Sequence, residues 1–345
     1  MGFFDGLRRD KRNQAKKYEE QSAVQRAPIE KVEVPAPVVE PESEPEPVED
    51  NKLPSMKDIE PADRYAAVED VRRESQPLKT YRDKKPVEHV VGQTKIIAII
   101  NQKGGVGKST TAINLSAALG VRGKQVLLVD LDPQGNTTSG LGIEKSRLNR
   151  CIYNVLLHDV PIEDVIIPDV CEGLDLVPAT ISLAGAEVEL VSEMARENRL
   201  KDAVGSLRGK YDYIFVDCPP SLGLLTVNSL VAADKLLIPI QCEFYALEGV
   251  TKLLDSMKRV KSRLNPALDI FGILLTMYDS RTTLSKQVAA EVKNYFGKQA
   301  FDTIIPRTVK LSEAPSYGMP INQYDPNGKG ALAYSELAEE VMRRG

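Results

Sequence analysis

The sequence predicts an α/β fold, a single doubly wound and mostly parallel sheet, preceded by a long disordered N-terminal tail. Residues 94–345 alternate short apolar runs, rich in β-branched residues, with longer stretches of helical period, which is typical of βαβ units. The apolar runs are continuous, as expected for strands that helices cover on both faces. Residues 1–93 differ in composition, because they hold 10 of the 22 prolines but only 3 of the 23 glycines.

The tail at 1–93 is rich in proline and glutamate and begins with a basic segment. Proline and the mutual repulsion of the acidic residues in its middle favour an extended, disordered chain. The tail carries 17 basic and 20 acidic residues, which leaves 28 basic and 29 acidic residues for the folded part. The folded part is therefore nearly neutral, and its net charge does not indicate nucleic-acid binding.

Six strands are expected within 94–345, and each is a mainly apolar run that favours a buried strand. In order they are Ile-Ile-Ala-Ile-Ile at 96–100, Val-Leu-Leu-Val at 126–129, Leu-Asp-Leu-Val at 174–177, Tyr-Ile-Phe-Val at 213–216, Lys-Leu-Leu-Ile-Pro-Ile at 235–240 and Ile-Phe-Gly-Ile-Leu-Leu-Thr at 270–276. Segments of helical period lie between or after them at 109–121, 183–207, 222–232, 247–264 and 284–295, and a last helix follows Gly330. This alternation over about 250 residues predicts one domain.

The composition excludes several classes of protein. No stretch approaches 18 uninterrupted apolar residues, so a membrane-spanning helix is not expected. The first 20 residues lack the apolar core of a secretory signal, since charges begin at Asp5. The four cysteines form no CxxC pair, and two histidines are too few for a histidine metal site. A cytoplasmic protein without a disulfide framework is expected.

The segment after the first strand has the features of a phosphate-binding loop, and it reads Asn101-Gln102-Lys103-Gly104-Gly105-Val106-Gly107-Lys108-Ser109-Thr110. Glycines let consecutive backbone N–H groups turn toward an anion, and the following helix adds the positive end of its dipole. Lys108 is placed to reach the β and γ phosphates of a nucleotide, and Ser109 to ligate Mg²⁺. The usual pattern G-x-x-x-x-G-K-[ST] is broken, because Gln102 stands in the place of the first glycine and Lys103 follows it. A P-loop NTPase domain with an unusual loop is therefore predicted.

Two expected strands end in aspartates that can serve this loop, since the carboxyl ends of parallel strands meet at one edge of a sheet. Asp132 follows the second strand, where a carboxylate can hold the attacking water or support the metal shell. Asp217 ends the strand at 213–216, as in a Walker B element that holds Mg²⁺ through water. Either aspartate alone fits a turn or cap residue equally well, but together with the loop they indicate a hydrolytic site.

These residues resemble the ParA/Soj chromosome and plasmid partitioning ATPases, members of the deviant Walker A group that also contains MinD. The resemblance covers Lys95 to Gly345 and rests on five ordered blocks, at 103–110, 130–136, 217–221, 239–243 and 311–316. It implies that Lys103 is the signature lysine, which reaches the phosphates bound by the partner subunit of an ATP-sandwiched homodimer. It also implies catalytic roles for Lys103, Lys108 and Asp132, magnesium ligation by Ser109, Asp132 and Asp217, and ATP contacts by the loop from Lys103 to Thr110.

The function that the resemblance implies is a switch. The ATP-bound dimer is expected to bind double-stranded DNA without sequence preference, and a ParB-like centromere-binding partner to stimulate its slow ATP hydrolysis. Hydrolysis would release the monomers and give chromosome segregation by a cytoplasmic, nucleoid-associated protein. A chromosomal role is preferred to a plasmid role, because the chain lacks the recognisable N-terminal helix-turn-helix domain of the larger plasmid relatives.

Nonspecific DNA binding needs cations clustered toward phosphates. By family position Arg281 and Lys310 are favoured, and Arg307 is a third candidate. A basic run at 258–263 is a weaker candidate, since it fits a solvated helix face better. Met277 and Pro306 are candidates for contact with the nucleotide base, although each also fits an ordinary core or turn position.

Two other functions remain open at the level of sequence. A MinD-like membrane-associated ATPase would share the loop but should end in an amphipathic basic helix, whereas acidic residues interrupt the end of this chain. Phe3, Phe4 and Leu7, followed by basic residues, could contact a membrane surface, but a solvated tail or a protein-docking peptide is preferred. An ATP-dependent ligase of the dethiobiotin synthetase type would need a small-molecule site that is not recognisable here.

Overall fold

The computed structural model describes residues 93–243 and 246–344, apart from the side chains of 246–249. The predicted tail at 1–93 lies outside the described residues except for its last position. The candidate membrane segment with Phe3, Phe4 and Leu7 lies outside them as well.

Within the described residues, eight strands form one sheet in the order β3-β4-β2-β5-β1-β6-β7-β8. Their bounds are β1 (Lys95–Ile99), β2 (Val126–Asp130), β3 (Ile167–Cys171), β4 (Leu174–Val177), β5 (Tyr213–Asp217), β6 (Lys235–Gln241), β7 (Asp269–Tyr278) and β8 (Ala300–Pro306). β3 runs antiparallel to β4, and all the other pairings in this sheet are parallel. The predicted fold class, a doubly wound and mostly parallel sheet, is confirmed.

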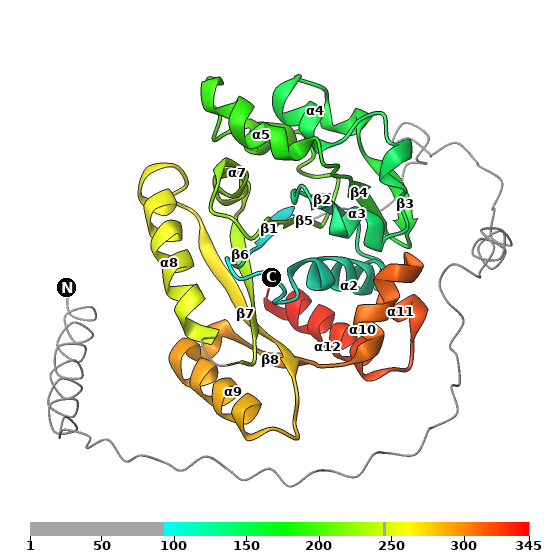
Figure 1. Cartoon of the computed structure of the whole chain (residues 1–345), viewed down its shortest axis with the longest axis vertical. Coiled ribbons are helices and arrows are strands. Elements are labelled where there is room, and N and C mark those ends of the chain that lie inside the picture. Colours follow the sequence, from blue (N-terminus) through cyan, green and yellow to red (C-terminus); the bar gives the residue numbers. More distant parts are fainter. Residues whose placement is uncertain (1–92, 244–245, 345) are drawn as a thin grey trace, which may run out of the picture. The chain divides into compact units, whose positions relative to one another are not determined.

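The helices cover both faces of the sheet (Figure 1). They are α2 (Lys108–Gly120), α3 (Asn136–Gly140), α4 (Ile152–Leu157), α5 (Leu183–Glu189), α6 (Arg199–Gly205), α7 (Leu224–Ala232), α8 (Ala246–Arg263), α9 (Thr283–Phe296), α10 (Val309–Glu313), α11 (Ile321–Tyr324) and α12 (Lys329–Arg344). Alternate residues of β1 face opposite sides of the sheet and belong to two separate core clusters. Ile96 and Ala98 pack with the layer of α4 to α9, whereas Ile97 and Ile99 pack with α2 and α12. Because successive side chains of a strand face opposite sides of the sheet and both sides are covered here, every position of β1 from Ile96 onward is apolar.

α12 is packed into the second layer through Leu337 and Val341, which are fully buried. Its Tyr334 hydroxyl lies 3.2 Å from Thr111 Oγ1 on α2, so the C-terminal helix lies against the helix that follows the phosphate loop. No helix among the described residues is long and apolar enough to span a bilayer.

The prediction of one helical segment at 183–207 is wrong, because the chain there forms two separate helices, α5 and α6. Polar contacts stabilise the break: Arg199 pairs with Glu193 at 2.6 Å, and Asn228 donates to the Arg196 carbonyl at 2.8 Å. Ala195 also has a positive φ of 51°, which a continuous helix excludes.

Two strands and several short helices were not expected from the sequence. β3 contains Pro168 and Asp169, and β8 contains Asp302 and Thr303, so neither reads as a continuous apolar run. Both lie at the edges of the sheet, where polar residues are tolerated. The short helices α3, α4, α10 and α11 lie in connections that the helical period did not reveal.

Candidate active site

The loop between β1 and α2 is shaped by its own glycines and by a neighbouring asparagine. Gly105 and Gly107 have φ values of +73° and +88°, in the left-handed region that other residues rarely adopt. Asn101 donates from Nδ2 to the Pro239 carbonyl at 2.7 Å, and its Oδ1 accepts from the Lys103 N–H at 3.0 Å. The start of the loop is thereby attached to β6.

Thr276, near the end of β7, holds the other side of the loop. Its Oγ1 donates to the Val106 carbonyl at 2.8 Å, and both residues are buried. α2 begins immediately after the loop, with Gly107 as its N-cap. The first N–H groups of a helix have no acceptor within the helix, so this end offers donors and a positive dipole to an anion.

Lys108 lies at the centre of this arrangement and is buried. Its Nζ donates to the Lys103 carbonyl at 3.4 Å across the loop. Burial lowers the pKa of Lys108, and the charge of Asp217 acts in the opposite direction. A buried ammonium with one long hydrogen bond is suited to binding an anion that enters the loop.

Asp130 and Asp217 lie side by side as register partners at the ends of β2 and β5, and both are fully buried. Burial raises the pKa of each carboxyl, and the charge of Asp217 also raises that of Asp130. Thr137 Oγ1 donates to Asp217 Oδ2 at 2.7 Å, whereas Asp217 Oδ1 is buried and has no partner within normal hydrogen-bond geometry among the described residues. The Ser109 hydroxyl is close enough to this carboxylate to lower its pKa, against the effect of burial. Asp217 Oδ1 is therefore available to a metal-bound water or another donor.

Asp130 orders the loop that carries Asp132. Its Oδ2 accepts from the Thr138 N–H at 2.8 Å and from Thr138 Oγ1 at 2.6 Å, and its Oδ1 accepts from the Asp132 N–H at 3.2 Å. Asp132 itself accepts from the Gln134 N–H at 3.0 Å through Oδ1 and lines the cavity described next. The sequence had pointed to Asp132 but not to the buried aspartate that positions its loop.

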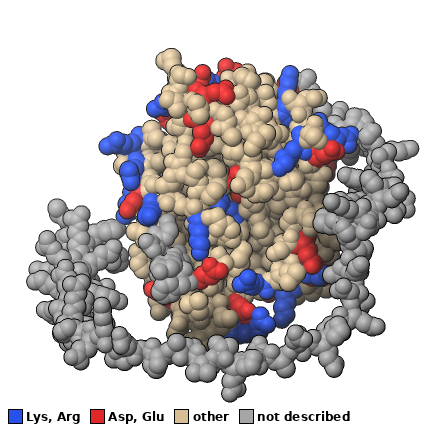
Figure 2. All heavy atoms as spheres, viewed as in Figure 1, with Lys and Arg blue, Asp and Glu red and all other residues tan. Residues whose placement is uncertain are grey.

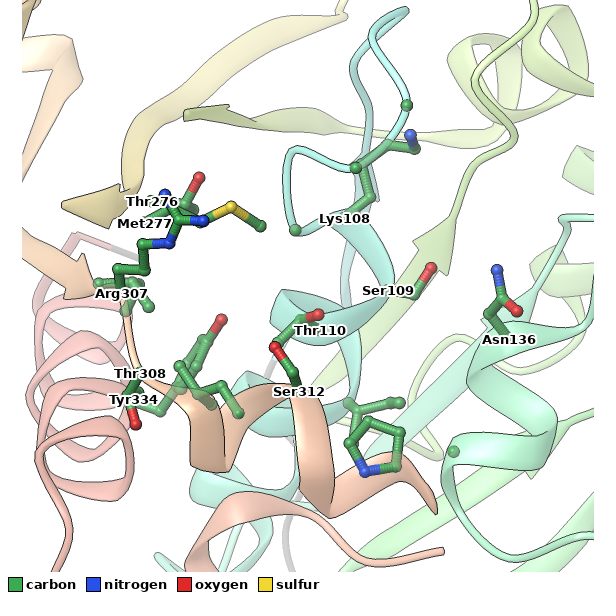
Figure 3. A pocket seen from close by; sticks show the side chains of 18 of the residues that line it. Lys108, Ser109, Thr110, Asn136, Thr276, Met277, Arg307, Thr308, Ser312 and Tyr334 are labelled. Atoms are coloured by element: carbon green, nitrogen blue, oxygen red, sulfur yellow. The ribbon is translucent and has the colours of Figure 1, made fainter. Parts of the chain in front are cut away.

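A cavity of about 880 Å³ opens beside the loop (Figure 3). Of the residues predicted to bind or process a nucleotide, those that line it are Gly104, Gly105, Gly107, Lys108, Ser109, Thr110, Asp132, Met277 and Pro306. Met277 and Arg307 lie across the cavity from Lys108 and Ser109. Val106, Lys103 and Asp217 are not among the lining residues. The volume is within the range of small-molecule sites. One wall is the phosphate loop with the start of α2, and the opposite wall includes Met277 and Arg307.

Lys103 is not among the residues that line the cavity of its own chain. Its Nζ pairs with Glu243 Oε2 at 3.3 Å, and both side chains are about half exposed, at 46% and 45%. Exposed pairs of this kind contribute little to stability, so Lys103 can leave Glu243 for a stronger anion at small cost.

Of the three DNA-binding candidates, Arg281 lies in the loop after β7, Arg307 directly follows β8, and Lys310 lies on α10. The ends of β7 and β8 are register partners at Tyr278 and Pro306. Arg281 forms a two-point pair with Asp279, with Nη2–Oδ2 at 2.7 Å, and hydrogen bonds from Arg281 lower the pKa of Asp279 to about 2. Lys310 pairs with Glu313 at 3.0 Å. Arg307 lines the nucleotide-sized cavity, a position that the sequence did not suggest.

Cations and acids are interspersed on the face that Figure 2 shows, in keeping with the nearly neutral composition of the folded part. In the basic run at 258–263, Lys258 Nζ lies 3.5 Å from Asp255 Oδ1, and Lys261 Nζ lies 3.7 Å from Asp269 Oδ1. These pairs fit the solvated helix face that was preferred for this run.

Comparison with known proteins identifies the family. Residues 94–270 match a family model described as an AAA domain. The sporulation initiation inhibitor protein Soj of Bacillus subtilis is 57% identical over 251 residues, which cover 73% of this chain and 99% of that protein. The chromosome partitioning protein ParA of Myxococcus xanthus is 55% identical over 250 residues, 72% of this chain and 88% of that protein.

Among solved structures, the cobyrinic acid a,c-diamide synthase of Mycobacterium smegmatis, with bound ADP and magnesium, superposes with a TM-score of 0.64. It is 41% identical, and the match covers 72% of this chain and 94% of that one. The Soj and ParA relatives are more similar in sequence and match over nearly their whole length. With its P-loop fold and the blocks of sequence around the loop, the chain therefore belongs to the Soj/ParA family of chromosome partitioning ATPases.

Proposed function

We propose that this chain binds ATP and Mg²⁺ in the cavity beside the loop, and that bound ATP joins two copies of the chain into a dimer. The position of Lys103 carries this proposal. Lys103 belongs to the phosphate loop, but it does not line the cavity of its own chain and pairs instead with Glu243 at the surface. A lysine so placed is suited to the phosphates of a nucleotide bound by a second copy, where two lysines per nucleotide would stabilise the negative charge.

The residues present fit the nucleotide and its metal. Loop N–H groups from Gly104 to Gly107, together with Lys108, would hold the phosphates. Ser109 would ligate Mg²⁺ directly, and Asp217, with its unpaired buried oxygen, and Asp132 would hold the waters around it. The metal would neutralise part of the phosphate charge. Asp132, which lines the cavity, is the proposed residue for orienting the attacking water.

Met277 and Pro306 remain proposals for contact with the base. Met277 lies across the cavity from the loop, and Pro306 lines the same cavity, which supports them. Arg307 lines the same wall, so a nucleotide contact is a second proposed role for it beside DNA binding. Residues 94–345 are proposed as the ATPase domain, with 1–93 as a separate tail.

The proposed dimer binds double-stranded DNA without sequence preference, and Arg281 and Lys310 are the favoured contacts. A ParB-like partner is proposed to stimulate slow hydrolysis, which releases the dimer from DNA on the nucleoid in the cytoplasm. The names of the relatives, chromosome partitioning ParA and Soj, support a role in chromosome segregation.

The test of the proposed switch is binding of an arbitrary labelled DNA duplex by the full chain with ATP, ADP or no nucleotide, at one fixed moderate salt concentration. Binding with ATP alone is expected. Equal binding in the three states, or none in any, would refute the proposed DNA switch. Vesicle binding with ATP would then favour a MinD-like function.

The dimer is tested separately by sedimentation with Mg²⁺ and ATP. Lys103→Ala is expected to bind ATP but to remain monomeric, because the variant keeps every residue that lines the cavity. A stable ATP-dependent dimer of Lys103→Ala would contradict the proposed reach across subunits.

A further inference from the structure

The segment that contains α5 carries two apolar stripes, and only one of them enters the core. The buried stripe follows helical spacing and consists of fully buried Leu183, Ala186 and Leu190. A second stripe, also spaced by three and four residues, faces solvent and consists of Ile181, Ala184, Val188 and Val191. Ile181 and Val188 are 76% and 75% exposed, and Met194, just beyond, is 90% exposed. A surface helix normally turns polar residues to solvent, so this second stripe lacks the partner that its composition implies.

Large exposed apolar side chains are concentrated here. Five of the thirteen such residues in the described part of the chain lie between positions 181 and 222, namely Ile181, Val188, Val191, Met194 and Leu222. Single exposed apolar residues are ordinary, but a contiguous group marks a contact surface. The solvent-facing stripe with Met194 is called the α5 stripe below.

The α5 stripe adjoins the active site. Gly223, at the start of α7, lies so close to Glu187 of α5 that a β-carbon on Gly223 would overlap the Glu187 carboxylate. The five residues that precede Gly223 lead directly from Asp217 at the end of β5, and Pro220 among them lines the cavity. Figure 1 shows α5 beside α7 on this side of the sheet.

We propose that the α5 stripe packs against a second copy of this chain in the ATP-bound dimer. This inference rests on the dimer proposed above and extends its interface beyond the nucleotide. Phosphates and lysines supply charge but little apolar area, whereas stable dimer interfaces bury about 800 Å² per partner around an apolar centre. In a two-fold dimer both copies use the same patch, so one interface would bury the α5 stripes of both copies at once.

The test compares Val188→Glu with Leu332→Glu in the full chain. Leu332 is 53% exposed on α12, in the layer on the opposite face of the sheet, so its variant adds the same charge away from the proposed interface. Sedimentation velocity with a non-hydrolysable ATP analogue and Mg²⁺ gives the dimer dissociation constant. We expect it to rise at least tenfold in Val188→Glu and to stay within about twofold in Leu332→Glu, since a charge desolvated in an apolar contact is costly.

ATP affinity measured on dilute monomer, and the thermal midpoint, should match the wild type in both variants, which separates a lost contact from misfolding. Val188→Ser serves as a milder variant and should weaken the dimer less than the glutamate. If Val188→Glu dimerises like the wild type while Lys103→Ala does not, the stripe proposal is wrong and the ATP dimer stands. If the wild type itself stays monomeric, the proposed function fails. Normal dimerisation with loss of stimulation by a ParB-like partner would assign the stripe to that partner and also overturn the inference.

Discussion

Thr276→Val replaces one hydroxyl with a methyl group of similar size at the point where β7 holds the phosphate loop. The change removes the 2.8 Å hydrogen bond to the Val106 carbonyl, and this carbonyl lies in a buried residue. A buried polar group left unpaired costs about 1–3 kcal/mol. This loss destabilises the loop conformation that presents its N–H groups to phosphate. We therefore expect ATP affinity to fall by about 5-fold to about 140-fold, at 1.4 kcal/mol per factor of ten.

Thr276→Ser is the matched control, since it keeps the hydroxyl and loses only the methyl group. Isothermal titration of dilute, nucleotide-free protein with ATP and Mg²⁺ measures both variants against the wild type. Thr276→Ser should stay within about fourfold of the wild type, because the single buried methyl group that it loses is worth about 0.8 kcal/mol. Equal affinity of the valine and serine variants would refute the claim that this hydroxyl holds the loop in its binding conformation.

Three further predictions concern catalysis, DNA binding and stability. Asp132→Ala should keep ATP affinity but lose ATP turnover, and hence stay on DNA; normal phosphate release would contradict its assignment. Lys310→Glu should weaken DNA binding and lower its salt slope by about one while ATP binding is unchanged, and an unaltered slope would place the DNA surface elsewhere. Burial alone would raise the pKa of Glu340, but hydrogen bonds from Thr303 and Asp302, at 2.7–2.9 Å, outweigh it and lower the pKa. Because that pKa lies below its unfolded value, the stabilisation is present above about pH 4.3 and is lost as the pH falls through the folded value. Urea titrations at pH 7 and pH 3.5 should therefore show Glu340→Gln less stable than the wild type by about 1–3 kcal/mol at pH 7 and by less at pH 3.5, and a pH-independent difference would argue against an ionised Glu340.

The sequence predicted the centre of the sheet better than its edges. β1, β2 and β5 are buried on both faces, and the continuous apolar runs identified them. Their only charged residues are Lys95 at the start of β1 and the aspartates that end β2 and β5. The edge strands β3 and β8 carry polar residues because one edge of each strand has no neighbour in the sheet, and these residues hid the strands. The break between α5 and α6 depends on Asn228 of α7, which no local pattern reveals.

In the site, local spacing identified the residues that belong to one loop, whereas contacts between distant segments escaped it. Gly104 to Ser109 form a contiguous motif, and the chemistry of phosphate binding fixes their order. Thr276 is separated from Val106 by 170 positions, so no local sequence pattern predicts their hydrogen bond. The pairing of Lys103 with Glu243 and the position of Arg307 in the cavity wall likewise arise only when strands far apart in sequence become neighbours.

The place of β1 in the sheet has a consequence for biosynthesis. β1 is the first described strand to leave the ribosome, yet it lies between β5 and β6, and its register partner for Lys95 is Tyr213. A nascent chain that ends before β5 therefore exposes an apolar strand and a phosphate loop that lacks both Asp217 and Thr276. Long-range parallel pairing of this kind is slow, which leaves the strand open to chaperones or to aggregation during translation. If the proposed function holds, the complete nucleotide site therefore forms only after β7, which carries Thr276, has been made.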